Sequence, residues 1–334
     1  MAVFTDVSVD EASAFVAQLE IGKLTGFCGI QAGIENSNFF LDTEQAGAAS
    51  HWVLTIFERL TFEQLPFYLQ LMRHLARRGI PVPEPQPDRS GAILHRLKGK
   101  PAALVNKLVG GHQLAPDVDH CMQVGAMLAR MHLAGQDFAL AQPNLRGLAW
   151  WVETVPLVRP FLADQQRMLI DDELAFQQQV ALSPAHASLP RGAIHADLFR
   201  DNVMFHRGEV GHEKLSGFFD FYFAGVDAWL FDIAVCVNDW CIDLASGAMV
   251  DDRAQAFVAA YGQVRPLTSN ERRLMPSMLR AAAFRFWLSR LWDVHLPRDA
   301  TLLKAHDPTH FERVLRARVS QPWHPETNAH RETH

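Results

Sequence analysis

At 334 residues the chain is longer than one ordinary hydrophobic core needs, so we expect two lobes or domains. Hydrophobic residues make up 49% and charged residues 20%, as in soluble globular proteins. The net charge is -6, and lysine and arginine form no basic cluster of the kind that binds nucleic acid. The four cysteines form no regular disulfide framework, and no segment has the pattern of a signal peptide or a membrane span. These features predict a cytoplasmic protein.

The first third of the chain predicts a mainly β lobe. Short apolar segments alternate with turn residues, and one segment has a strong helical period that ends at a glycine. The expected elements, in order, are a helix from Asp10, two strands within residues 26–41, a strand at 51–57, a helix over 60–75 that ends before Gly79, and strands at 92–97 and 102–108.

The rest of the chain predicts helices. Apolar residues recur at helical spacing from Cys121 to His132, and most later segments behave in the same way. Three short strands interrupt them, at 192–194, 203–205 and 214–219. The sequence therefore predicts an α+β protein with an N-terminal antiparallel β lobe, a larger helical lobe and a flexible tail, at residues 1–108, 109–320 and 321–334.

The strongest chemical signal is the loop at residues 195–202, whose spacing H-x-D-x-x-x-x-N is that of a kinase catalytic loop. Phosphoryl transfer needs a carboxylate that takes the proton of the acceptor hydroxyl, and a metal ion that neutralises charge on the phosphate. Asp197 is the candidate base. Asn202 offers an amide oxygen, a ligand type that Mg²⁺ accepts. His195 is expected to hold the loop by hydrogen bonding.

A second carboxylate, Asp220, follows the apolar strand that ends at Phe219, as the metal-binding Asp of the D-F-G element does. The tripeptide here continues with Phe221 and Tyr222 and lacks the glycine, so a protein-kinase activation loop is not expected and a small acceptor is favoured. Each motif alone recurs by chance. Their order and their position between strands predict a kinase that uses ATP and Mg²⁺.

Two segments of the β lobe are candidates for nucleotide binding. Backbone amides in the turn at residues 33–38 would cover the phosphates, although an ordinary hairpin turn has the same composition. The strand before Gly110 would offer backbone groups to adenine, although any edge strand before a linker has this pattern. The candidate residues are Gly33, Asn36, Ser37 and Asn38 in the turn and Val105 and Lys107 in the strand.

Taken in order, these motifs resemble the phosphotransferases related to aminoglycoside and choline kinases, and within them the homoserine kinase branch. The resemblance implies a bilobal protein-kinase-like fold and transfer of the ATP γ-phosphate to the side-chain hydroxyl of L-homoserine, a step of threonine biosynthesis. The charge and composition predict no nucleic-acid or membrane partner, and we expect a monomer or homodimer. The segments that carry it are residues 33–38, 53–58, 79–83, 195–202, 220–224 and 238–241.

The resemblance also implies roles for single residues. Asp232 resembles a buried carboxylate that braces the catalytic loop, which is a structural role. Thr55 lies where the wider superfamily has a lysine that contacts the phosphates, and it joins the nucleotide-binding candidates. Arg59 would share a strand face with Thr55 if the strand continued, which makes it a candidate for the missing cation.

The acceptor is less well defined by the sequence. A homoserine pocket needs partners for a carboxylate and for an ammonium group, and the candidates are Tyr222, Asp227, Asn238 and Trp240. The two aromatic residues among them could equally be core. Two alternatives remain open, namely a related kinase of choline, an aminoglycoside or a thiosugar, and a pseudokinase that only binds nucleotide.

Overall fold

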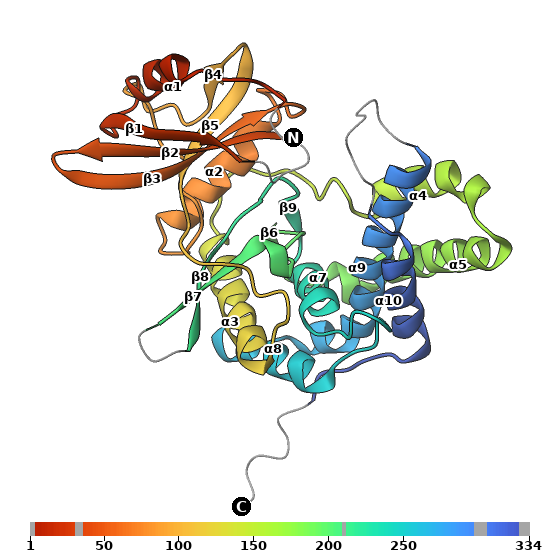
Figure 1. The fold of residues 1–334 in the computed structure, drawn as a ribbon. Coiled ribbons are helices and arrows are strands. Elements are labelled where there is room, and N and C mark those ends of the chain that lie inside the picture. The colour runs from red at the N-terminus through yellow and green to blue at the C-terminus, as the bar shows by residue number, and fades with distance from the viewer. Residues whose placement is uncertain (1–3, 31–35, 209–211, 297–305, 327–334) are drawn as a thin grey trace, which may run out of the picture. The chain divides into compact units, whose positions relative to one another are not determined.

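The structure, a computed structural model, describes residues 4–30, 36–208, 212–296 and 306–326. The chain divides into two compact units, and each is described by itself. The first unit comprises residues 1–109 together with 216–219, and the second comprises residues 110–215 and 220–334 (Figure 1). The first contains an antiparallel sheet and the second is mainly helical, so the predicted α+β class is confirmed.

The first unit is built on a five-stranded antiparallel sheet with the strand order β1-β2-β3-β5-β4 (Figure 1). Successive side chains of a strand point to opposite faces of the sheet, so every second residue of β2, β3 and β5 packs against the helix α1. That core face is made by Phe15 and Val16 of α1 and by Phe39, Leu41, Leu54, Ile56, Ala102 and Leu104 of the sheet. The elements are α1 (Val9–Val16), β1 (Lys23–Gly29), β2 (Asn36–Gln45), β3 (Ala48–Phe57), α2 (Leu65–Ala76), β4 (His95–Leu97) and β5 (Lys100–Asn106).

Two turns of this unit follow the sequence signals. Gly79, three residues past α2, has φ +77°, the left-handed conformation that a glycine adopts at low cost after a helix. Lys98 and Gly99 have φ values of 54° and 78° and form the tight turn between β4 and β5. The turn lies between the two strands that the sequence predicts at 92–97 and 102–108, of which the second begins earlier, at Lys100.

The second unit surrounds the buried helix α7, in which all twelve residues are buried. The helices α3 and α8 approach closely, because a Cβ atom at Gly125 would lie 2.3 Å from the carbonyl oxygen of Phe257. None of the helices among the described residues combines the length and hydropathy needed to span a bilayer. The helical elements are α3 (Val118–Ala134), α4 (Leu148–Val158), η1 (Arg159–Phe161), α5 (Asp164–Ala181), α6 (Pro184–Ala187), η2 (Arg200–Asn202), α7 (Trp229–Trp240), α8 (Asp251–Val264), α9 (Ser269–His295) and α10 (Thr309–Ser320).

Four short strands form two small two-stranded sheets, β6 with β9 and β7 with β8. Three of them were expected from the sequence. The fourth, β9, was missed because it has only four residues and runs directly into α7. Their bounds are β6 (Arg191–Ile194), β7 (Val203–Arg207), β8 (Glu213–Phe218) and β9 (Gly225–Ala228).

Two details differ from the sequence prediction. Asn36, Ser37 and Asn38 lie in β2 and not in a turn, while Gly33 falls outside the described residues. Residues 321–326 were assigned to a flexible tail but are held against α8, where buried Trp323 donates its indole N–H to Asp251 at 2.6 Å. These six residues therefore belong to the folded unit.

Candidate active site

The predicted catalytic loop connects β6 to β7 within the second unit. Asp197 lies at its centre, and its side chain is 16% exposed. The preceding residue, Ala196, has φ 64°, a left-handed conformation that costs a residue with a Cβ about 1–2 kcal/mol. Such a conformation persists only where surrounding contacts impose it, and it is common at active sites.

Two carboxylates of α7 impose the conformation of this loop. Asp232 accepts hydrogen bonds from the backbone amides of His195 and Ala196, both at 2.8 Å. Asp239 accepts from the backbone amide of Arg200 at 2.8 Å and from its Nε at 3.1 Å. The two carboxylates are seven residues apart, two helical turns, and so lie on one face of α7. One helix therefore fixes both ends of the loop.

The sequence analysis assigned the brace to Asp232 alone and missed Asp239 and Arg200. The missed pair has a signal in the sequence, since Asp239 follows Asp232 at helical spacing inside an apolar segment where a charge needs a partner. Arg200 is 7% exposed and also donates from Nη1 to the carbonyl of Leu114 at 2.9 Å. The buried Arg200 side chain thus joins the loop to α7 and to the segment at Leu114.

The candidate metal ligands lie around Asp197. Asn202 donates from Nδ2 to the backbone carbonyl of Asp197 at 2.8 Å, which leaves its Oδ1 as an oxygen ligand. Asp220 has φ 68°, the second left-handed residue of this region. Burial raises the pKa of Asp197 well above its usual value, the nearby guanidinium of Arg285 opposes this, and the Asp220 carboxylate raises it further. A carboxylate whose pKa is raised by a second carboxylate is in a setting that a divalent cation would stabilise.

This donor set fits Mg²⁺ better than a transition metal. In the described part of the chain no three His, Cys, Asp or Glu side chains are grouped as a protein-only metal site. Mg²⁺ keeps waters and substrate phosphates in its octahedron and needs only one or two protein carboxylates. The residues present therefore fit a metal that is bound together with a phosphate.

Behind the loop, Asp232 continues into a buried hydrogen-bond chain. His132 lies within hydrogen-bond distance of Asp232 on one side, with Nε2 3.0 Å from Oδ2, and of Tyr261 on the other, with Nδ1 2.8 Å from the hydroxyl. Arg265 donates to the Tyr261 hydroxyl at 3.3 Å and is paired with buried Glu271. The chain is consistent in direction if the tyrosine donates to Nδ1 and Nε2–H donates to the carboxylate.

Arg285 of α9 was missed by the sequence analysis. It is 3% exposed, and its Nη1 lies 3.9 Å from Oδ1 of Asp197. The signal was available, because Arg285 is the one charged residue between Arg280 and Arg290 in a helical segment otherwise rich in alanine and aromatic residues. An arginine at such a position is rarely buried without a partner.

The predicted nucleotide-binding residues of the first unit fall on different faces of its sheet. Ser37 is fully buried on the face covered by α1, where its Oγ accepts from the amides of Phe4 and Thr5 and donates to Glu58. Asn38 and Thr55 are cross-strand partners on the opposite face, and Thr55 donates to Asn38 at 2.8 Å. Only the second pair shares a face that α1 leaves uncovered.

The strand candidates lie on that second face as well. Val105 pairs with Val53 of β3, and the Lys107 ammonium lies over the Phe40 ring at 4.2 Å. The backbone amide of Lys107 is already bonded to the carbonyl of His51. β3 ends at Phe57, so Arg59 lies beyond the strand that was expected to orient it.

The four acceptor candidates have different environments. Asn238 and Trp240 are buried in α7, and both have protein partners: Asn238 bonds to Leu279 and Arg318, and the Trp240 indole donates to the carbonyl of Leu198. The polar atoms of both side chains are thus paired within the second unit. Burial, and then the charge of Asp220, raises the pKa of the Tyr222 phenol.

Asp227 lines a separate small pocket of about 220 Å³. Its carboxylate is bonded to Arg191 at 2.8 Å and to Asn144 at 2.9 Å. Asp197 and Asp220 are absent from the lining of this pocket. The structure thus gives Asp227 partners of its own, away from the catalytic loop.

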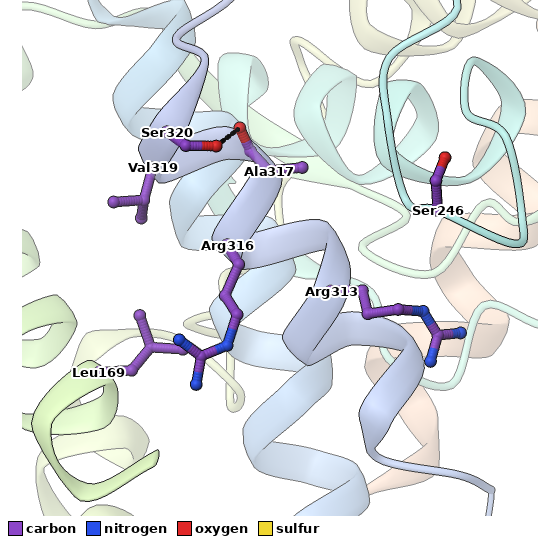
Figure 2. Close-up of a pocket in the computed structure, with 7 residues that line it drawn as sticks. All are labelled: Leu169, Ser246, Arg313, Arg316, Ala317, Val319 and Ser320. Atoms are coloured by element: carbon purple, nitrogen blue, oxygen red, sulfur yellow. Dashed lines mark hydrogen bonds between the residues drawn. The ribbon is translucent and has the colours of Figure 1, made fainter. Parts of the chain in front are cut away.

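A broader hollow of about 500 Å³ lies along α10, with Leu169 and Ser246 at its sides (Figure 2). Its cations do not converge: Figure 2 shows Arg316 directed toward Leu169 and Arg313 directed to the side of Ser246. Arg316 is also paired with Glu312 at 2.8 Å. This hollow lacks the polar groups that phosphoryl transfer requires.

Comparison with known proteins identifies the family. Residues 26–267 match the phosphotransferase enzyme family known as APH. The chain belongs to this family. It is 64% identical over 97% of its length to a protein of Polaromonas naphthalenivorans (strain CJ2) named homoserine kinase, 99% of which is covered. A protein of the same name from Cupriavidus metallidurans is 57% identical over 97% of this chain and all of that protein.

Solved structures support the fold of this phosphotransferase. An amicoumacin kinase in complex with AMP-PNP, Ca²⁺ and Ami aligns with a TM-score of 0.64 at 18% identity, over 94% of this chain and 93% of that one. A choline kinase from Cryptosporidium parvum aligns with a TM-score of 0.62 at 14% identity, over 88% and 89%. The expected kinase-like fold is confirmed.

Proposed function

We propose that this phosphotransferase is a homoserine kinase, which transfers the γ-phosphate of ATP to the side-chain hydroxyl of L-homoserine. The observation that carries the proposal is the 64% identity over nearly the full length of both chains to a protein of that name. The catalytic loop supports it, because a braced loop with one carboxylate left for chemistry is what an alcohol phosphotransferase needs.

Asp197 is the proposed base. Within the part of the chain that the structure describes, its carboxylate has no hydrogen-bond partner, while its backbone carbonyl is bonded to Asn202. The carboxylate can therefore accept a hydrogen bond from the acceptor hydroxyl and take its proton as the phosphoryl group is transferred. The left-handed conformation of Ala196, which the hydrogen bond to Asp232 stabilises, fixes the direction of the Asp197 side chain.

Asn202 and Asp220 are the proposed Mg²⁺ ligands. When bound with ATP, the metal neutralises charge on the phosphate oxygens. Both residues have restrained backbones: Asn202 closes the 3-10 turn η2 and donates to the loop, and Asp220 sits in a left-handed conformation after β8. The face of β2, β3 and β5 opposite α1, with Asn38, Thr55 and Val105, is the proposed nucleotide surface of the first unit.

The test is turnover with a panel of hydroxyl acceptors. ADP release with Mg²⁺ and ATP would be measured with L-homoserine, choline, kanamycin and a thiosugar, and we expect kcat/KM to be largest for L-homoserine. Preference for another acceptor would overturn the substrate assignment but leave the phosphotransferase intact. ATP binding without turnover on any acceptor would instead support the nucleotide-binding pseudokinase.

A further inference from the structure

Arg285 has an environment that the phosphoryl-transfer chemistry described above leaves unexplained. Its side chain is 3% exposed, yet Nε and Nη2 are both buried and have no hydrogen-bond partner among the described residues. Leaving donors of a buried cation unpaired is costly, so proteins usually provide an acceptor. The contact with Asp197 does not meet this need, since it involves Nη1 at 3.9 Å, beyond hydrogen-bond distance.

The guanidinium is fixed in orientation by aromatic rings. Its Cζ lies 3.7 Å from the ring centroid of Phe286 and 4.9 Å from that of Phe223. Rings restrain the faces of a guanidinium and leave its edges for hydrogen bonding. Nε and Nη2 share one edge, and this edge is the two-donor fork that binds both oxygens of a carboxylate.

Charged groups of both signs act on Arg285. Arg146 and Arg290 act on Arg285 as nearby cations, and Asp197 and Asp293 act as nearby anions. Burial lowers the pKa of Arg285 to about 10, so the guanidinium remains protonated at neutral pH.

We propose that the Nε–Nη2 edge of Arg285 binds the carboxylate of the acceptor, so that this site selects amino-acid alcohols over alcohols that lack a carboxylate. The inference rests on the proposed homoserine kinase function and adds the group that recognises the substrate. A short carbon chain joins the hydroxyl and the carboxylate of L-homoserine. One molecule can thus meet Asp197 with its hydroxyl and the Nε–Nη2 edge of the neighbouring guanidinium with its carboxylate.

The two rings beside the guanidinium differ in exposure. Phe286 is buried in α9, whereas Phe223 is partly exposed and follows the proposed metal ligand Asp220 by three residues. Rotation of the Phe223 side chain would open the guanidinium to a small ligand without moving a helix. The acceptor would then enter beside the residues that hold the metal.

The experiment compares two acceptors that differ only in the carboxylate, L-homoserine and 3-aminopropan-1-ol. For each, kcat/KM would be measured in the native protein, in Arg285→Met and in Arg285→Lys. We expect the native protein to prefer L-homoserine strongly, and Arg285→Met to lower the ratio of the two kcat/KM values by roughly 10- to 100-fold, the worth of a charge-assisted pair. Most of this change should appear in KM for L-homoserine.

Arg285→Lys keeps the charge but loses the fork, so its ratio should lie between those of the native protein and Arg285→Met. Arg273→Met, an exposed position on the same helix, is the matched control and should leave the ratio unchanged. Because a general loss of folding or of Asp197 activity affects both acceptors alike, an unchanged ratio in both Arg285 variants would overturn the inference.

The native protein also tests the inference without any variant. Equal use of the two acceptors would mean that the carboxylate is not recognised, which overturns the role of Arg285 while the kinase assignment stands. If the native protein turns over choline or kanamycin and not L-homoserine, the proposed function itself is wrong, and the assignment of Arg285 is wrong with it.

Discussion

The catalytic loop of the second unit and the sheet of the first unit use their polar side chains in opposite ways. In the loop, side chains from α7 satisfy the backbone amides, and the Asp197 carboxylate has no hydrogen-bond partner within the described residues. In the sheet, backbone pairs with backbone, and side chains such as Ser37 and Thr55 are bonded to other protein groups. A polar side chain is therefore a better functional candidate where other groups already make the hydrogen bonds of the nearby backbone and the side chain itself has no protein partner.

The largest expected effect is that of Asp197→Asn. The amide cannot take the proton of the acceptor, so kcat should fall by about 10²–10⁴. The Asp197 side chain makes no hydrogen bond within the described residues, so the melting temperature should change little and ATP binding should persist. Steady-state kinetics, thermal unfolding and nucleotide titration would check this.

A variant with full turnover would contradict the role of Asp197 as base. A variant that loses turnover because it unfolds would instead contradict the contrast drawn between the loop and the sheet, since the loop would then depend on the Asp197 carboxylate for its stability. The two outcomes are separated by the unfolding curve.

Removal of the brace should act mainly on stability. Asp232→Ala leaves two backbone amides and the His132 imidazole without their acceptor in a fully buried setting, so the free energy of unfolding should fall by roughly 3–5 kcal/mol. Chemical denaturation would measure it. Asp252→Ala at the exposed start of α8 is the control, with an expected loss of under about 1 kcal/mol. A loss for Asp232→Ala as small as the control's would contradict the brace.

Ser37→Ala sharpens the contrast within the sheet. It removes an acceptor of two backbone amides, of which that of Thr5 is buried, and a donor to Glu58, so stability should fall by roughly 1–3 kcal/mol while KM for ATP stays the same. Thr55→Val, on the face that α1 leaves uncovered, should instead raise KM for ATP several-fold at a smaller cost in stability. A rise in KM for Ser37→Ala would return this residue to the nucleotide site.

Much of this arrangement could be predicted from the sequence, for identifiable reasons. The catalytic loop and Asp220 have fixed spacing and strand context, and α2 has a clear helical period. Ser37 was assigned to a turn because it stands among Gly, Asn and Ser residues. Its polarity alone does not show whether its hydroxyl accepts from backbone amides, as it does here, or binds a ligand. Arg285 and Asp239 were missed because their partners lie 88 and 39 residues away, a proximity that only the fold creates.

The smallest expected effect is a pH dependence of the buried chain behind the loop. Burial lowers the pKa of His132; the Asp232 carboxylate opposes this, Arg265 adds to the lowering, and Glu271 opposes it. As the pH falls through about 6.5, His132 is therefore protonated in the unfolded chain but stays neutral in the folded protein. Stability should be fully present above about pH 6.5 and should fall below it, with a slope of at most about 1.4 kcal/mol per pH unit from this group.

The pKa of Asp232 is itself lowered by its contacts, chiefly the hydrogen bond from His132, against the effect of burial. Its contribution has the same sign but is lost only below its unfolded value near 3.8, so the two groups act in separate pH windows. His132→Gln keeps a hydrogen-bonding side chain and removes the titration between pH 5 and 6.5. Urea unfolding at half-unit pH steps should thus show a flatter profile for His132→Gln in that window, and an identical slope would mean that the acid sensitivity arises elsewhere.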